Sequence, residues 1–193
     1  MKRTEQRERT RSALLIAAAE EFESRGYAAT SLSHVAEKLG LVRGTVHFHF
    51  ATKQALAAAI IDHATTRWAS LQAESRERAG GVLRSLIWLS HEVADAYATD
   101  PRDRAAIRIV REDGTLGVTA SELVAQWTAF LTERLADSQQ AGEAKSDIRL
   151  DVDAPVLLAA FTGIVTSASP ASRKTLRQRV DRFWDYALTL IAS

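Results

Sequence analysis

The residues best suited to chemistry lie between Ser31 and Lys53, and their types fit contacts with nucleic acid better than catalysis. Arg43 can donate two parallel hydrogen bonds to guanine O6 and N7, which discriminates between bases by about 1–3 kcal/mol. Gly44 lets the backbone approach DNA closely. Hydroxyl, imidazole and ammonium groups bind phosphate oxygens, which position a protein without specifying sequence. The candidate DNA-binding residues are Ser31, Ser33, Arg43, Gly44, Thr45, His47, Phe48, His49 and Lys53.

Two short helices must present these side chains. Ser31 is a suitable N-cap for the first, and Val35, Ala36 and Leu39 give it one apolar stripe. Gly40 suits a helix end, because glycine enters the left-handed conformation at little cost. A second helix then begins at Arg43. Two helices joined by a three- or four-residue turn that contains glycine form a helix-turn-helix, whose second helix enters the major groove of DNA.

The inner positions of the second helix are Val46 and Phe50, which directs Phe48 outward. An exposed Phe48 can contact a thymine methyl group. The alternative is that Phe48 packs in the core, as most phenylalanines do.

The run GLVRGTVHFHFATKQAL resembles the recognition-helix signature of TetR-type transcriptional repressors, which is G-hydrophobic-x-x-G-T-hydrophobic-aromatic-x-H/Y-F-x-x-K-x-x-L. The resemblance implies a homodimer that binds double-stranded operator DNA and a small-molecule effector. Within it, Thr45, His47 and Lys53 are expected to bind phosphates. Two positions depart from the pattern. His47 stands where tyrosine is usual, and His34 stands where an acidic residue usually completes a capping box.

Metal binding and catalysis are not indicated. His47 and His49 are two residues apart on a helix, so they lie on nearly opposite sides and cannot share an ion. The chain lacks HExxH, GxSxG, P-loop and GxGxxG motifs and has no cysteine. We therefore expect no metal, no cofactor and no enzymatic activity.

The composition favours an all-α protein. Of 193 residues, 46% are hydrophobic, only three are proline and nine are glycine. No run of about 18 apolar residues predicts a membrane helix, and the charged start lacks the apolar segment of a signal peptide. The absence of cysteine fits a reducing compartment. The expected location is the cytoplasm.

The charge is distributed unevenly although the net charge is only +1. Residues 1–53 hold nine Lys and Arg against six Asp and Glu, a balance of +3, while residues 54–193 hold 16 against 18, a balance of −2. The basic N-terminal segment suits phosphate binding. The arginines near the N-terminus either form a solvated helix start or contact phosphates.

Hydrophobic periodicity and Gly or Pro breaks predict about nine helices. The N-terminal three-helix DNA-binding domain is expected at residues 1–52, and the C-terminal helical ligand-binding and dimerisation domain at residues 53–193. Loops are expected at Glu112–Val118 and at 140–149. The predicted helices are 5–25, 31–39, 43–50, 53–78, 82–98, 101–110, 119–139, 152–168 and 172–191.

The last two helices carry more apolar residues than one buried face requires. We expect such a pair to form a dimer interface with the same pair of a second copy, as the resemblance to the TetR family also implies. The alternative is that the pair completes the core of a monomer.

A ligand cavity is expected among the C-terminal helices. The frame AxxFxxxGYxxTSLxxVAxxxGLxxGTVxFHFxxKxxLAxAI is similar to that of γ-butyrolactone receptors, a TetR subgroup. This resemblance implies a pocket-lining role for Trp127 in WTAFLTERL and a ligand-bonding role for Thr162 in AAFTG. The alternative is that Trp127 is an ordinary core residue. The candidate ligand-binding residues are Trp88, Trp127, Phe161 and Thr162.

Together these observations predict a TetR-type repressor that a small apolar effector, butyrolactone- or furan-like, releases from its operator. A multidrug-responsive regulator of the same fold is one alternative. A helical enzyme or a protein-interaction module is another.

Overall fold

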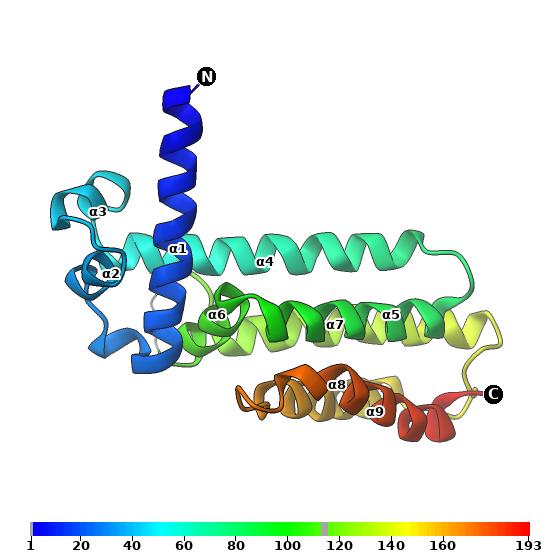
Figure 1. Cartoon of the computed structure of the whole chain (residues 1–193). Coiled ribbons are helices and arrows are strands. Elements are labelled where there is room, and N and C mark those ends of the chain that lie inside the picture. The colour runs from blue at the N-terminus through cyan, green and yellow to red at the C-terminus, as the bar shows by residue number, and fades with distance from the viewer. Residues whose placement is uncertain (1, 113–115) are drawn as a thin grey trace. The chain divides into compact units, whose positions relative to one another are not determined.

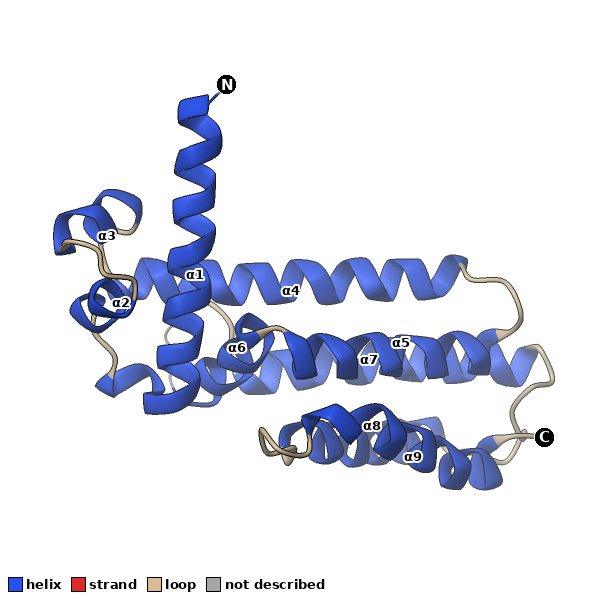
Figure 2. Ribbon diagram, in the orientation of Figure 1, coloured by secondary structure: helices blue, strands red, loops and turns tan. Residues whose placement is uncertain are grey.

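A computed structural model describes residues 2–112 and 116–193. Within these ranges the chain forms nine α-helices and one 3₁₀ turn, without a β-strand (Figure 1, Figure 2). None of the described helices is long and apolar enough to cross a membrane. The helices are α1 (Lys2–Ala29), α2 (Leu32–Lys38), α3 (Arg43–His49), α4 (Lys53–Glu77), α5 (Val82–Thr99), α6 (Pro101–Glu112), α7 (Ala120–Gln140), α8 (Leu150–Thr166) and α9 (Leu176–Ile191), with the 3₁₀ turn η1 at Arg173–Thr175.

The all-α class and the order of the helices are confirmed. Several boundaries differ from expectation, and three of these differences have a local structural cause. Helix α1 extends to Ala29, although Gly26 breaks its helical conformation with φ 83°. Helix α9 begins at Leu176 because a 3₁₀ turn precedes it. Glu112 was expected in a loop but belongs to α6, where Arg108 one turn earlier bonds its carboxylate at 2.6 Å. Residues 113–115 of that expected loop lie outside the described residues.

The chain forms two compact units. The first comprises residues 1–67 and 100–120, and the second comprises residues 68–99 and 121–193. The first unit is larger than the DNA-binding domain predicted at residues 1–52, because it also includes the start of α4 and all of α6. The functional division at residue 52 stays a prediction.

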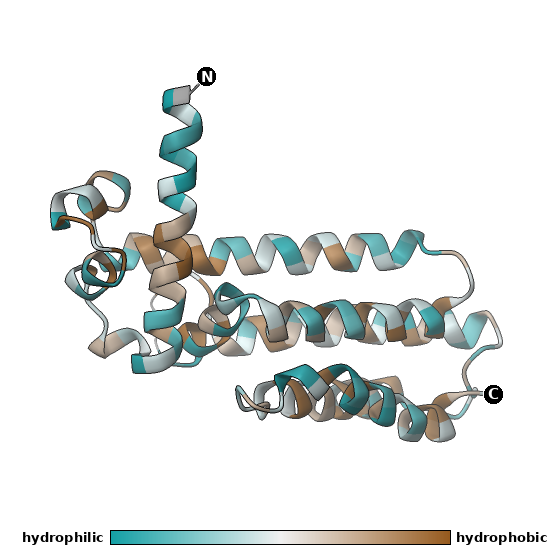
Figure 3. Cartoon of the chain, in the orientation of Figure 1, coloured by the Kyte–Doolittle hydropathy of each residue, from teal (hydrophilic) through white to brown (hydrophobic). Residues whose placement is uncertain are grey.

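The core of the first unit draws on each of its helices. The middle of α1 is apolar where it packs, whereas its first turns are hydrophilic (Figure 3). Helix α6 packs along α1, and α2 packs on α1 and α3. The fully buried apolar side chains of this unit include Leu14, Phe22, Val35, Val46, Leu56, Ile60 and Ile109.

Helix α6 also holds α1 at its break. The Glu112 carboxylate accepts a hydrogen bond from the Tyr27 backbone N–H at 2.7 Å, and Arg108 Nη1 donates to the Glu23 carbonyl. Arg104 adds an ion pair to the Glu23 carboxylate at 2.8 Å. These bonds satisfy backbone groups that the break at Gly26 leaves without helical partners. The two helices are therefore joined by specific polar contacts as well as by packing.

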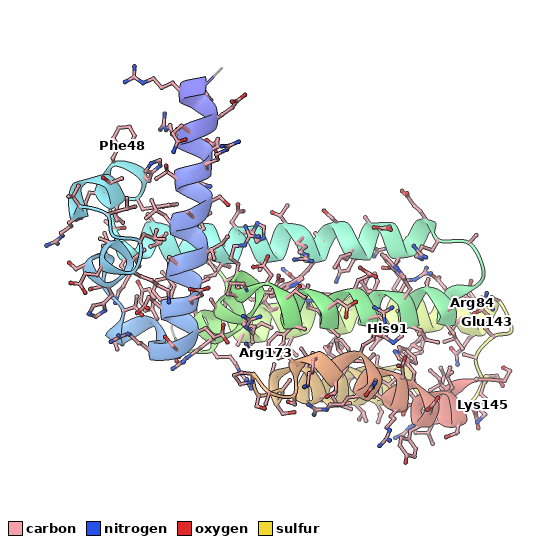
Figure 4. All side chains as sticks on the ribbon, viewed as in Figure 1. Phe48, Arg84, His91, Glu143, Lys145 and Arg173 are labelled. Atoms are coloured by element: carbon pink, nitrogen blue, oxygen red, sulfur yellow. The ribbon has the colours of Figure 1, made fainter. Side chains whose placement is uncertain are left out.

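The second unit has a separate apolar core supplied by α5, α7, α8 and α9. Two side chains of the loop between α7 and α8, Glu143 and Lys145, bond to the start of α5 and to the end of α9 (Figure 4). The Glu143 carboxylate accepts from the Val82 and Leu83 N–H groups at 2.9 Å, and the Lys145 ammonium donates to the Thr189 carbonyl at 2.9 Å. A negative group thus lies at the start of α5 and a positive group at the end of α9, as the helix dipoles favour.

Candidate DNA-binding surface and ligand cavity

Ser31 caps α2, and His34 completes the capping box in place of the usual acidic residue. The Ser31 hydroxyl accepts from the His34 N–H at 3.2 Å, and His34 Nδ1 accepts from the Ser31 N–H at 3.3 Å. A neutral imidazole nitrogen with a lone pair can therefore replace the usual carboxylate oxygen.

The end of α2 is tied to α1. The Glu20 carboxylate, assisted by Glu21, raises the pKa of Lys38 above its ordinary value of 10.5 despite partial desolvation. The ammonium lies 3.0 Å from Glu20 and 3.2 Å from Glu21. These contacts fix α2 against the helix beneath it.

The turn between α2 and α3 has the expected geometry. Gly40 adopts φ 63°, and the Leu41 N–H bonds back to the Ala36 carbonyl at 2.9 Å. Val46 is fully buried and Phe50 is 5% exposed, so the inward face of α3 is the one that the sequence predicts. A short helix is thus held by two apolar anchors with its other face open.

That open face carries the predicted DNA-binding side chains. Arg43, Gly44, His47 and Phe48 are exposed, and Thr45 and His49 are half-buried. Phe48 is 69% exposed and projects from α3 (Figure 4), so its outward orientation is confirmed. The Arg7 guanidinium of α1 lies 5.4 Å from the Phe48 ring centroid. Sequence reasoning did not anticipate this contact, because the two residues are far apart in the chain.

Lys53 and His47 are already engaged within the chain. The Lys53 ammonium donates to the Tyr27 carbonyl at 2.8 Å and to the Ala28 carbonyl at 3.2 Å, and it lies 4.4 Å from the Tyr27 ring centroid. Lys53 therefore ties the start of α4 to the end of α1, with one ammonium proton left for a phosphate. His47 Nε2 accepts from Arg43 Nε at 3.1 Å, and His47 Nδ1 lies 3.2 Å from the Ala51 carbonyl oxygen.

The second unit contains a partly open cavity of about 50 Å³. Trp127 and Phe161 line it, as the sequence predicts. Ser90 and Trp184 supply polar groups that bond each other, with Trp184 Nε1 donating to Ser90 Oγ at 2.6 Å. The remaining lining is apolar and comes from α5, α7, α8 and α9: Leu86, Leu89, Val93, Phe130, Leu131, Leu157, Leu158 and Phe183.

Two of the four predicted ligand-binding residues do not line this cavity. Trp88 is half-buried elsewhere on α5, where the Arg78 guanidinium lies 4.1 Å from its ring centroid. Thr162 is exposed on α8, one position beyond the lining residue Phe161. Successive helical residues point about 100° apart, so the neighbour of an inward residue need not face inward. Ser90, Phe183 and Trp184 were missed because their sequence pattern indicates only an apolar core.

A second, open groove runs along α8 and α9, which pack on each other. Val156, Tyr186 and Leu190 are 60%, 75% and 68% exposed beside it. Leu157 and Phe183 line both the groove and the inner cavity. The described residues contain no group of three or more His, Cys, Asp or Glu side chains that could hold a metal ion.

Residues 14–60 match the family of bacterial regulatory proteins known as the tetR family. The A-factor receptor protein of Streptomyces griseus is 30% identical over 177 residues, which cover 91% of this chain and 61% of that protein. The chain thus spans about three fifths of the length of this receptor. A crystal structure of a γ-butyrolactone receptor, an ArpA-like protein, superimposes with a TM-score of 0.82 at 26% identity, covering 97% of this chain and 90% of that one. The same values apply to CprB of Streptomyces coelicolor in complex with its operator sequence.

Proposed function

We propose that this chain, a member of the TetR family of bacterial regulatory proteins, is a homodimeric transcriptional repressor that a small apolar effector releases from operator DNA. One observation carries the proposal. Helix α3 is anchored by buried Val46 and Phe50 while Arg43 and Phe48 face outward. This is the arrangement that a helix needs to enter a major groove.

On the DNA, Arg43 reads a guanine and Phe48 contacts a thymine methyl group. Gly44 admits the backbone close to the duplex. The hydroxyls of Ser31, Ser33 and Thr45, together with His49 and the remaining proton of Lys53, bind phosphates and set the register. The location that follows for such a regulator is the cytoplasm.

The effector occupies the cavity beside Trp127 and Phe161. Its nearly apolar lining favours a ligand with a hydrocarbon chain and few polar atoms, such as a butyrolactone- or furan-like molecule. The similarity to γ-butyrolactone receptors supports this class. Ligand pockets usually measure roughly 300–1,000 Å³, so the present cavity of about 50 Å³ must enlarge to admit one. The effector therefore favours a different arrangement of the second unit, as a population shift requires. The small cavity gives no support to a broad multidrug pocket.

A second copy of the chain covers the groove of α8 and α9. Exposed Val156, Tyr186 and Leu190 form an apolar patch that water contacts in the single chain. Exposed patches of this kind mark interaction sites. In a two-fold dimer the same patch meets itself, and the two α3 helices can reach successive major grooves about 34–36 Å apart.

DNA binding is tested by titrating the protein against the DNA upstream of its own gene at two salt concentrations. Affinity should fall steeply with salt because bound phosphates release counterions. Arg43→Ala should lose about 1–3 kcal/mol of discrimination against unrelated DNA. Arg84→Ala removes an exposed arginine from α5 and is the matched control. Equal loss in both variants, or no specific binding by the wild type, would contradict the proposal.

The cavity is tested with a synthetic 2-alkyl-γ-butyrolactone as the probe. Trp127→Ala should abolish the release of DNA by the probe, whereas Trp88→Ala, which changes a tryptophan outside the cavity, should leave it intact.

The dimer is tested by sedimentation. Tyr186→Glu should give monomers, and Gln178→Glu, which adds the same charge to α9 outside the groove, should not.

A further inference from the structure

We propose that His47 is a positioning residue that orients the Arg43 guanidinium for base reading, rather than a phosphate-binding residue. The inference rests on the proposed function and deepens it. It concerns the position at which this chain has histidine in place of the usual tyrosine. Three groups in one row carry it: the Arg43 side chain, the His47 ring and the Ala51 carbonyl.

The hydrogen bonds of this row require one protonation state. Arg43 Nε lies 3.1 Å from His47 Nε2, and His47 Nδ1 lies 3.2 Å from the Ala51 carbonyl oxygen. Arginine can only donate and a carbonyl can only accept. Nδ1 therefore carries the proton and Nε2 offers its lone pair. The neutral Nδ1–H tautomer satisfies both contacts at once.

The row also orients the Arg43 guanidinium toward the open face of α3. Residues four apart lie on the same face of a helix, so Arg43 and His47 share the open face of α3. Ala51 follows the helix, so its carbonyl anchors the ring to the turn before α4. The contact with His47 uses only Nε of the guanidinium. The two terminal nitrogens stay available, and these form the planar fork that can bond guanine O6 and N7.

This arrangement lowers the entropic cost of base reading. A free arginine side chain loses rotamer freedom when it binds, which opposes binding. Holding Nε before binding removes part of that cost. A phosphate contact from His47, by contrast, would require one of its two existing hydrogen bonds to break. The geometry thus favours positioning over direct phosphate binding.

One experiment examines the row without DNA. Nitrogen-15 NMR of the histidine rings reports which nitrogen of His47 carries the proton, and a His47→Gln variant assigns the signal. We expect the Nδ1–H tautomer in the wild type and a mixture of tautomers in Arg43→Ala, which removes the donor to Nε2. A predominant Nε2–H form in the wild type would overturn the inference.

The second experiment is a double-mutant cycle with operator DNA in which each guanine in turn is replaced by 7-deazaguanine, which lacks N7. His47→Phe keeps a ring but removes both nitrogens. It should reduce discrimination against the modified guanine by about twofold to tenfold. His47→Gln should restore part of that loss, because its amide oxygen can accept from Arg43 Nε. In the Arg43→Ala background, His47→Phe should change nothing further.

The outcomes separate the two proposals. In one outcome, the wild type binds specifically, but His47→Phe weakens binding to all sequences alike and its effect adds to that of Arg43→Ala. This result would identify His47 as a phosphate contact and overturn only this inference. Failure of the wild type to bind any sequence specifically would overturn the proposed function and this inference with it. Circular dichroism of each variant confirms that helix content is unchanged.

Discussion

The buried pair of Ser90 and Trp184 predicts a measurable stability change from one missing oxygen. Ser90→Ala leaves Trp184 Nε1–H without its acceptor inside an apolar cavity. Stranding a buried donor costs about 1–3 kcal/mol. A water that replaced the hydroxyl could bridge Trp184 Nε1 and the Ile87 carbonyl, which Ser90 also bonds at 2.7 Å, but at an entropic cost of up to about 2 kcal/mol. Either route destabilises the variant.

Ser138 provides a matched control. Its hydroxyl is fully buried and donates to a carbonyl three residues back at 2.7 Å, as that of Ser90 does. Ser138→Ala therefore has the same loss of a local hydrogen bond and the same gain in helix propensity as Ser90→Ala. It does not leave a tryptophan N–H without an acceptor. Urea unfolding followed by circular dichroism should show Ser90→Ala less stable than Ser138→Ala by about 1–3 kcal/mol. The melting temperature should fall by about 2–4 °C per kcal/mol. Equal stabilities of the two variants would refute the reasoning.

Two further stability changes follow from charged contacts. Glu143→Gln should destabilise the chain by about 0.5–2 kcal/mol in urea unfolding, because it removes the negative charge at the start of α5, while the exposed Asp147→Asn in the same loop should have little effect. Burial alone would raise the pKa of Asp100, but hydrogen bonds from the Arg102 side chain and backbone, with its positive charge, lower it below the ordinary 3.8. A lowered folded pKa adds stability above pH 3.8 that is lost as the pH falls further. The urea midpoint of the wild type should therefore decline more steeply below pH 4 than that of Asp100→Asn, and parallel curves would argue against the contribution.

Local patterns in the sequence were enough to predict the helices and the outward face of α3. Glycine after an apolar stripe predicts a helix end, and buried Val46 with Phe50 leaves Phe48 exposed. These features depend on neighbours within one or two helical turns, so a single sequence contains them. The same holds for Trp127 and Phe161, although their cavity role also needed a family resemblance.

The capping of α2 shows where a residue-type rule is too narrow. The rule asks for an acid at the third position, and the structure satisfies the same backbone N–H with His34 Nδ1. What matters is a lone pair at the correct distance. The sequence shows that the acidic residue is absent, but it does not show that the His34 ring is oriented to accept the same hydrogen bond.

The sequence by itself thus determined the all-α class, the order of helices, the helix-turn-helix and the residues on its open face, because backbone hydrogen bonds, caps and helical periodicity act over short separations. Only the tertiary structure decided that α6 packs with α1, that Trp184 and Ser90 rather than Trp88 and Thr162 complete the cavity lining, and that Lys53 is held by the end of α1. Those outcomes depend on helices that lie far apart in the chain. Their relative rotation and distance follow from the packing of whole apolar faces, which no local pattern encodes.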